Sequence, residues 1–156
     1  MTQQENNLGE TYVLFELAGT VYAIPSAEVR QLEMIEHITP VPNAPEAVEG
    51  VVFSRGQVIP ALSLRKRFGF PKADYDMRSR LVVVSVGERS LGLIVDSARE
   101  FKRIPADSIS PPPDTIAETT GKYISGITSD GDRLILILDL AELITEGDEI
   151  QTESNG

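Results

Sequence analysis

The side chains that could do chemistry in this sequence are few, and their spacing does not assemble a catalytic or metal site. His37 is the only histidine and there is no cysteine, so a zinc centre, which needs three or four such ligands, is not predicted. Asp130 and Asp132 flank a glycine but lack the further acidic ligands of a calcium loop. No nucleophile elbow or phosphate-binding glycine loop is present. The sequence therefore predicts a protein that is not an enzyme and that needs no cofactor and no metal.

One residue does suggest binding. Arg55 stands in Phe53-Ser54-Arg55-Gly56, where Gly56 predicts a tight turn between two strands. An arginine at a turn tip offers a rigid fork of donors that suits a carboxylate or the backbone carbonyls of a partner. The alternative is an internal salt bridge that holds the turn in place.

The charge of the chain narrows the class of partner. The net charge of −10 argues against nucleic acid and against an anionic membrane surface as the main partner. Six acids and one base lie before residue 41, whereas seven bases and two acids lie between residues 55 and 80. Segregation of this kind suits protein–protein docking, and a chance excess of arginine in a solvated loop is the alternative. No apolar run approaches the ~20 residues of a membrane span and no signal peptide is present, so we expect a cytoplasmic protein without direct membrane insertion.

The elements that must position these residues form two copies of one pattern. Residues 12–25 recur at 81–94, and residues 50–64 recur at 126–140. The repeated runs are apolar, rich in β-branched residues and bounded by glycine, as strands are. Each copy is close to the lower size limit of an independent domain, so the two should pack on each other. The sequence predicts an all-β fold in which two small β-barrels of duplicated pattern pack together, with a few single-turn helices.

The expected folded domain covers residues 11–146, with pseudo-repeats at about 11–70 and 78–146. The polar ends, residues 1–10 and 147–156, are predicted to be disordered tails. Residues 134–138 are apolar without alternation, which indicates a strand covered on both faces. Whether strands exchange between the two barrels stays open at this stage.

The stretch from Val48 to Arg65 resembles the hallmark of CheW-type chemotaxis coupling proteins, Gly-Val-x-Asn-Leu-Arg-Gly-x-x-(Val/Ile)-Pro-x-x-x-Leu-Arg. The likeness extends to residues 22–25, 42–45, 91–96 and 131–138, and covers about residues 11–145. It implies a pair of SH3-like barrels and a non-enzymatic adaptor. The implied partners are the cytoplasmic tip of a methyl-accepting chemoreceptor and the regulatory domain of a CheA-type histidine kinase. It also implies that the adaptor is recruited to receptor arrays at the membrane.

The resemblance further implies a receptor-binding groove between the barrels. The residues concerned are Val29, Gly50, Phe53, Ser54, Arg55, Gly56, Val95 and Asp96. Phe53-Ser54 stand where the family usually has Asn-Leu, which leaves open the receptor that is bound and the pathway that is served. A homologous adaptor in a non-flagellar pathway, such as type IV pilus motility, is the nearest alternative. A β-barrel module for oligonucleotide or oligosaccharide is more remote, because the chain has four tyrosines, five phenylalanines, no tryptophan and an acidic balance.

Overall fold

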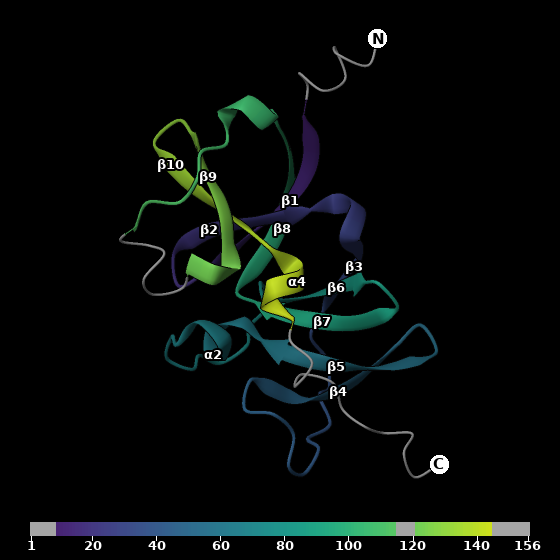
Figure 1. The fold of residues 1–156 in the computed structure, drawn as a ribbon. Helices are drawn as coiled ribbons and strands as arrows, with labels where there is room; N and C mark the ends of the chain where they lie inside the picture. The colour runs from purple at the N-terminus through teal and green to yellow at the C-terminus, as the bar shows by residue number, and fades with distance from the viewer. Residues whose placement is uncertain (1–8, 115–120, 145–156) are drawn as a thin grey trace.

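The structure is a computed structural model that describes residues 9–114 and 121–144. The predicted tails lie outside these ranges, apart from Gly9 and Glu10, at which the first strand begins. The chain forms two five-stranded sheets, which lie one above the other in Figure 1. The upper sheet has the order β8 (Ser97–Ile104), β1 (Glu10–Leu17), β2 (Thr20–Pro25), β10 (Arg133–Leu138) and β9 (Ile124–Asp130). The lower sheet has the order β3 (Val29–Met34), β6 (Arg80–Val86), β7 (Arg89–Val95), β5 (Gln57–Ser63) and β4 (Val48–Ser54).

The strands exchange between the two sheets, which answers the question that the sequence left open. The first two strands of each copy join the last three strands of the other copy. In the upper sheet β1 pairs antiparallel with β8, and β2 pairs parallel with β10. The lower sheet repeats both pairings, with β6 antiparallel to β3 and β7 parallel to β5. The two sheets are therefore related by the sequence repeat, although neither sheet is built from one copy alone.

The apolar residues form three cores, one inside each barrel and one between them. The upper barrel encloses a cluster that includes Leu14 and Ile135, and the lower barrel encloses one that includes Ile59 and Leu81. The largest cluster joins both sheets, and it contains Phe15 and Leu62. Leu14, Phe15, Ile59 and Leu62 are all buried in these clusters.

This three-core arrangement explains why several strands lack alternation. On β10, Ile135 and Ile137 face the barrel interior, whereas Leu136 and Leu138 face the cluster between the sheets. The expectation that this run is covered on both faces is confirmed for these four residues. Leu134 differs, because 51% of its surface is exposed near the end of the strand.

Helices are few and short, as predicted: η1 (Ser26–Glu28), α2 (Leu64–Phe68), η2 (Ala106–Ser108), η3 (Gly121–Tyr123) and α4 (Leu140–Leu143). The Asp139 side chain caps α4 by accepting a hydrogen bond from the Glu142 amide at 3.3 Å. Ser63 caps α2 in the same way, through the Lys66 amide at 3.2 Å. Both helices directly follow a strand of the repeat, β5 in one copy and β10 in the other.

Candidate functional site

The turn between β4 and β5 carries most of the predicted site residues. Ser54 pairs with Gln57, so Arg55 and Gly56 form a two-residue loop. Their φ angles are +50° and +79°, as the tight type I′ hairpin turn requires. Glycine adopts such a φ without strain, but an arginine in this region costs about 1 kcal/mol. Arg55 is therefore a strained, exposed arginine at the hairpin tip.

The Arg55 guanidinium has no hydrogen-bond or ion-pair partner among residues 9–114 and 121–144. The internal salt bridge, which the sequence left as an alternative, is therefore not formed within the described part of the chain. Phe53 stands beside this turn with 75% of its surface exposed. Val58 lies directly across the hairpin from Phe53 and is also exposed. The tip thus presents a free cation next to an exposed apolar pair.

Ser54 has a different environment, because it is buried and bonded to the neighbouring edge strand. Its hydroxyl donates to Glu33 Oε2 at 2.7 Å and accepts from Gln31 Nε2 at 2.6 Å. Gln31 Nε2 also donates to Glu33 Oε2. These three side chains hold β4 to β3 across a gap where the backbones are not paired. Ser54 therefore supports the turn from inside and leaves the outer contacts to Phe53 and Arg55.

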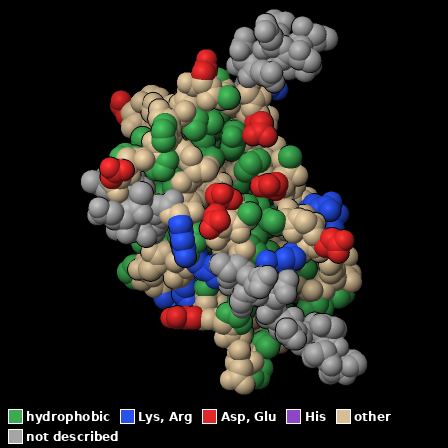
Figure 2. All heavy atoms as spheres, in the orientation of Figure 1, with side chains coloured by type: hydrophobic (Ala, Val, Ile, Leu, Met, Phe, Trp, Pro, Cys, Tyr) green, Lys and Arg blue, Asp and Glu red, His purple; other side chains and the backbone are tan. Residues whose placement is uncertain are grey.

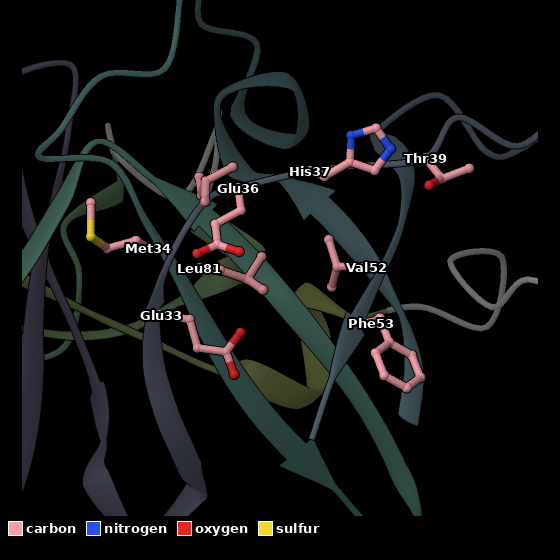
Figure 3. A pocket seen from close by; sticks show the side chains of 9 residues that line it. Glu33, Met34, Glu36, His37, Thr39, Val52, Phe53 and Leu81 are labelled. Atoms are coloured by element: carbon pink, nitrogen blue, oxygen red, sulfur yellow. The ribbon is translucent and has the colours of Figure 1, made fainter. Parts of the chain in front are cut away.

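The gap between β3 and β4 is an open seam in the lower barrel, since these are the two end strands of its sheet. Past the end of β3, two backbone hydrogen bonds of 2.9 Å between Thr39 and Val51 close it. A cleft of about 660 Å³ lies on the seam. Figure 3 shows Glu33 and Glu36 on one side of it, Val52 and Phe53 on the other, and Leu81 between them.

Gly50 shows why the hallmark motif needs a glycine before its valine. Its φ is +155°, and a Cβ atom there would lie 2.1 Å from the Thr39 carbonyl oxygen. Any side chain would therefore break the backbone contact that closes the seam. Gly126 is the equivalent residue in the second copy, and a Cβ there would lie 2.4 Å from a side-chain carbon of Ile109. Both copies thus use a glycine where the segment that precedes the strand in the sequence crosses it.

The two predicted valines lie in or beside the core between the barrels. Val95 belongs to that core with 1% of its surface exposed, and Val29 is half-buried against it. Val29 pairs with Val84 of β6 and so lies at the start of the edge strand β3. Of the two, only Val29 offers surface to a partner without a rearrangement.

Asp96 follows Val95 at the end of β7 and joins elements of both barrels. Its carboxylate accepts from Arg65 Nε at 2.9 Å and from Arg65 Nη2 at 2.7 Å. It also accepts from the Ala18 amide, in the β1–β2 turn, at 2.9 Å. Arg65 in turn donates to the Pro71 carbonyl at 2.8 Å. We call Asp96, Arg65, Ala18 and Pro71 the inter-barrel latch.

The latch lowers the pKa of Asp96. Burial pushes this pKa up, but the hydrogen bonds from Arg65 and Ala18 outweigh burial, so the pKa lies below its ordinary value of 3.8. Asp96 is therefore ionised at neutral pH, and its carboxylate is already hydrogen-bonded to donors within the protein. Its predicted role in binding is thus accompanied by a structural one that the sequence does not reveal.

The eight predicted residues do not form one continuous surface. Phe53, Arg55 and Gly56 are exposed at the hairpin tip, whereas Gly50, Ser54 and Val95 are buried beneath the surface. Sequence reasoning missed Gln31, Glu33 and Arg65, which hold the seam and the latch. The hallmark motif, which ends at Arg65, gives a signal for that residue. For Gln31 and Glu33 the signal is the repeat, because Glu100 and Lys102 stand at the equivalent positions.

Charge is segregated on the surface, as the sequence suggests. Figure 2 shows basic side chains mostly over the middle and lower part of the face, and acidic ones mostly over the upper part. Within the described residues, no group of three or more metal-ligating side chains is found. No helix in the described ranges has both the length and the apolar character of a membrane span.

Comparison with known proteins gives one consistent result. Residues 11–148 match the family described as CheW-like domain. The chemotaxis protein CheW of Helicobacter pylori is 32% identical over 144 residues, which cover 91% of this chain and 86% of that protein. Protein FrzA of Myxococcus xanthus is 26% identical over 137 residues, which cover 86% of this chain and 85% of that protein. The crystal structure of the scaffolding protein TtCheW from Thermoanaerobacter tengcongensis superposes with a TM-score of 0.81 at 31% identity, covering 92% of each chain. This likeness confirms the pair of SH3-like barrels.

Proposed function

This chain belongs to the CheW-like family, and we propose that it is a non-enzymatic adaptor between chemoreceptors and a histidine kinase. It would bind the cytoplasmic tip of a methyl-accepting chemoreceptor and the regulatory domain of a CheA-type kinase. In this role it acts in the cytoplasm and is recruited to receptor arrays at the membrane. The observation that carries the proposal is Arg55, a strained and exposed cation with no partner among the described residues.

Each predicted site residue has a place in this proposal. Arg55 and Phe53 make direct contacts, Gly56 allows the turn that presents them, and Val29 contributes apolar surface. Four further residues act from beneath: Gly50 and Ser54 shape the seam, while Val95 and Asp96 hold the two barrels together. Coupling needs two surfaces whose occupancies affect each other. A pair of barrels joined by one shared core and one latch supplies a physical connection between such surfaces.

A second candidate is the same kind of adaptor in a non-flagellar pathway, such as type IV pilus motility. The similarity to protein FrzA, a relative that is not named CheW, supports this second candidate. Phe53-Ser54 in place of the usual Asn-Leu also favours it, because one of the two positions is exposed at the tip. The two candidates share their physics and differ in the receptor that is bound.

The test is a binding assay of the full chain with two purified partners, the regulatory domain of a CheA-type kinase and a receptor cytoplasmic fragment. We expect both to bind. Arg55→Ala should weaken receptor binding at least about tenfold, as truncation of an interface arginine commonly does. Its free energy of unfolding should stay within about 1 kcal/mol of wild type, because the residue is exposed. Binding to neither partner would refute the adaptor role, and an unfolded variant would show that Arg55 is structural.

A further inference from the structure

The two barrels contain equivalent seams. Ion pairs bridge the seam of the upper barrel, whereas hydrogen bonds from neutral donors bridge the seam of the lower barrel. In the upper barrel the seam lies between β8 and β9, which are the end strands of that sheet. The repeat relates Glu100 to Gln31 and Lys102 to Glu33. On β8, Glu100 pairs with Leu14 and Lys102 pairs with Tyr12. On β3, Gln31 and Glu33 pair in the same way with Val83 and Leu81 of β6. The second copy therefore provides an internal comparison for the lower seam.

The upper seam is closed by its own ion pairs. Arg133 donates to both carboxylate oxygens of Glu100 at 3.1 Å and to Asp130 at 2.8 Å. Lys102 lies 3.5 Å from the same Asp130 carboxylate. The hydrogen bond from Arg133, followed by the charge of Lys102, holds the pKa of Asp130 below its ordinary value of 3.8. Glu100, Lys102, Asp130 and Arg133 thus all have ion-pair partners within the described part of the chain.

The lower seam leaves its charges unpaired. Its middle is held by neutral donors, the Gln31 amide and the Ser54 hydroxyl, bonded to Glu33. On one side of this trio lies the cleft with Glu33 and Glu36. On the other side lies a second hollow of about 420 Å³ lined by Arg30 and Arg55, with Gln31 and Ser54 between. Within the described ranges, neither Arg30, Arg55 nor Glu36 forms an ion pair.

The lower seam therefore has a cationic end and an acidic end, which are two hollows separated by the bonded trio. Arg30 is tied only through Nε, which donates to Ser85 Oγ at 2.8 Å, so its other two nitrogens stay available. Glu36 is exposed beside Met34, which has 53% of its surface exposed. Phe53 and Val52 give the acidic end an apolar wall (Figure 3). Opposite charges at the two ends of one seam fix the direction in which a partner lies across it.

We propose that this seam binds an extended segment of a partner protein that carries an acidic side chain near one end and a basic side chain near the other. The acidic side chain pairs with Arg30 and Arg55, and the basic one pairs with Glu36 against the apolar wall of Phe53. Arg30 precedes Glu33 by three residues and Glu36 by six. A segment that rises ~3.3 Å per residue should therefore space its two charges by no more than about six residues, the separation of Arg30 and Glu36 along the chain. This inference rests on the proposed adaptor function and assigns the chemistry of one of its partner segments.

The test is titration of the full chain against the same kinase regulatory domain and receptor fragment at low and high salt. Glu36→Lys and Arg30→Glu should each weaken binding to one of these partners by about fivefold or more at low salt. The loss should shrink toward ~0.5 M salt, because exposed charge pairs are screened there. Asp132→Lys and Arg103→Glu make the same charge changes at exposed positions of the upper barrel and should alter affinity less than about twofold. Thermal melting of each variant confirms that it is folded.

The outcomes separate the two ideas. If the wild-type chain binds a partner but both seam variants stay within twofold of it, the seam proposal is wrong and the adaptor function stands. Equal losses in the seam variants and in the upper-barrel controls would show a general effect of net charge, which also overturns the proposal. If the wild-type chain binds neither partner, the adaptor function fails and the seam proposal fails with it.

Discussion

Asp96→Asn tests whether Asp96 stabilises the fold or contacts a partner. In the wild type its carboxylate accepts three hydrogen bonds, two from Arg65 and one from the Ala18 amide. Asparagine keeps one acceptor oxygen and turns an NH₂ donor toward groups that are themselves donors. Side-chain exposures of 21% and 30% mean that solvent partly screens the pair. We therefore expect a loss of about 1–3 kcal/mol in the free energy of unfolding, or a fall in Tm of roughly 3–10 °C.

The same substitution should change how stability depends on pH. The pKa of Asp96 is lowered in the folded protein. Its stabilising contribution is therefore complete above the unfolded pKa of about 3.9 and is lost as pH falls through the folded value. Melting curves from pH 7 to pH 2.5 should show wild type and Asp96→Asn well separated near neutrality. The separation should shrink below about pH 4.

A matched control is Asp132→Asn, which removes the same charge from an exposed turn. It should leave Tm within about 2 °C of wild type, as exposed substitutions usually do. The reasoning is refuted if Asp96→Asn melts like wild type at every pH. If that variant also loses binding to the receptor fragment, Asp96 contacts the receptor and does not hold the barrels.

Three further predictions concern the closure of the barrels and their shared core. Gly50→Ala should lower the free energy of unfolding, measured by urea titration, by well over 2 kcal/mol, because its Cβ would overlap a carbonyl oxygen. Gly56→Ala has open space around it and should lower the same free energy by about 1 kcal/mol. Leu138→Ala should lower the free energy of unfolding by about 2–5 kcal/mol, because the side chain is 2% exposed. Leu134→Ala should lower it by under about 0.5 kcal/mol. Equal losses in the two variants would contradict the placement of the core. A chain cut within the 71–79 loop should give two halves that are unfolded alone by circular dichroism and that fold when mixed, because each sheet needs strands from both halves; a half that folds by itself would refute this.

The local features of the fold were readable from the sequence because they rest on local chemistry. Gly56 predicts a tight turn, because the turn depends on residues only a few positions apart. The apolar run at residues 134–138 predicts a strand covered on both faces, because no solvent-facing residue interrupts it. These expectations are confirmed, except that Leu134 itself is exposed.

The long-range features could not be read in the same way. A repeat shows that two segments form the same element, but it does not show whether each pairs within its own copy or with the other. Arg65 and Asp96 are separated by 31 residues, and nothing local to either residue identifies the other. The trio at the seam depends on β3 and β4 meeting as the two ends of one sheet, which is a property of the closed barrel.

The exchange of strands has a consequence for how the chain is made. The β1–β2 hairpin leaves the ribosome before its partners β8 and β10, which belong to the second copy. At ~5–20 residues per second, the hairpin must wait on the order of ten seconds with both edges unpaired. The strands β3, β4 and β5 wait likewise for β6 and β7 to complete their sheet. Neither barrel can close until strands of the second half are synthesised. A truncated message therefore does not yield a smaller folded barrel. It yields exposed strand edges, which aggregate readily.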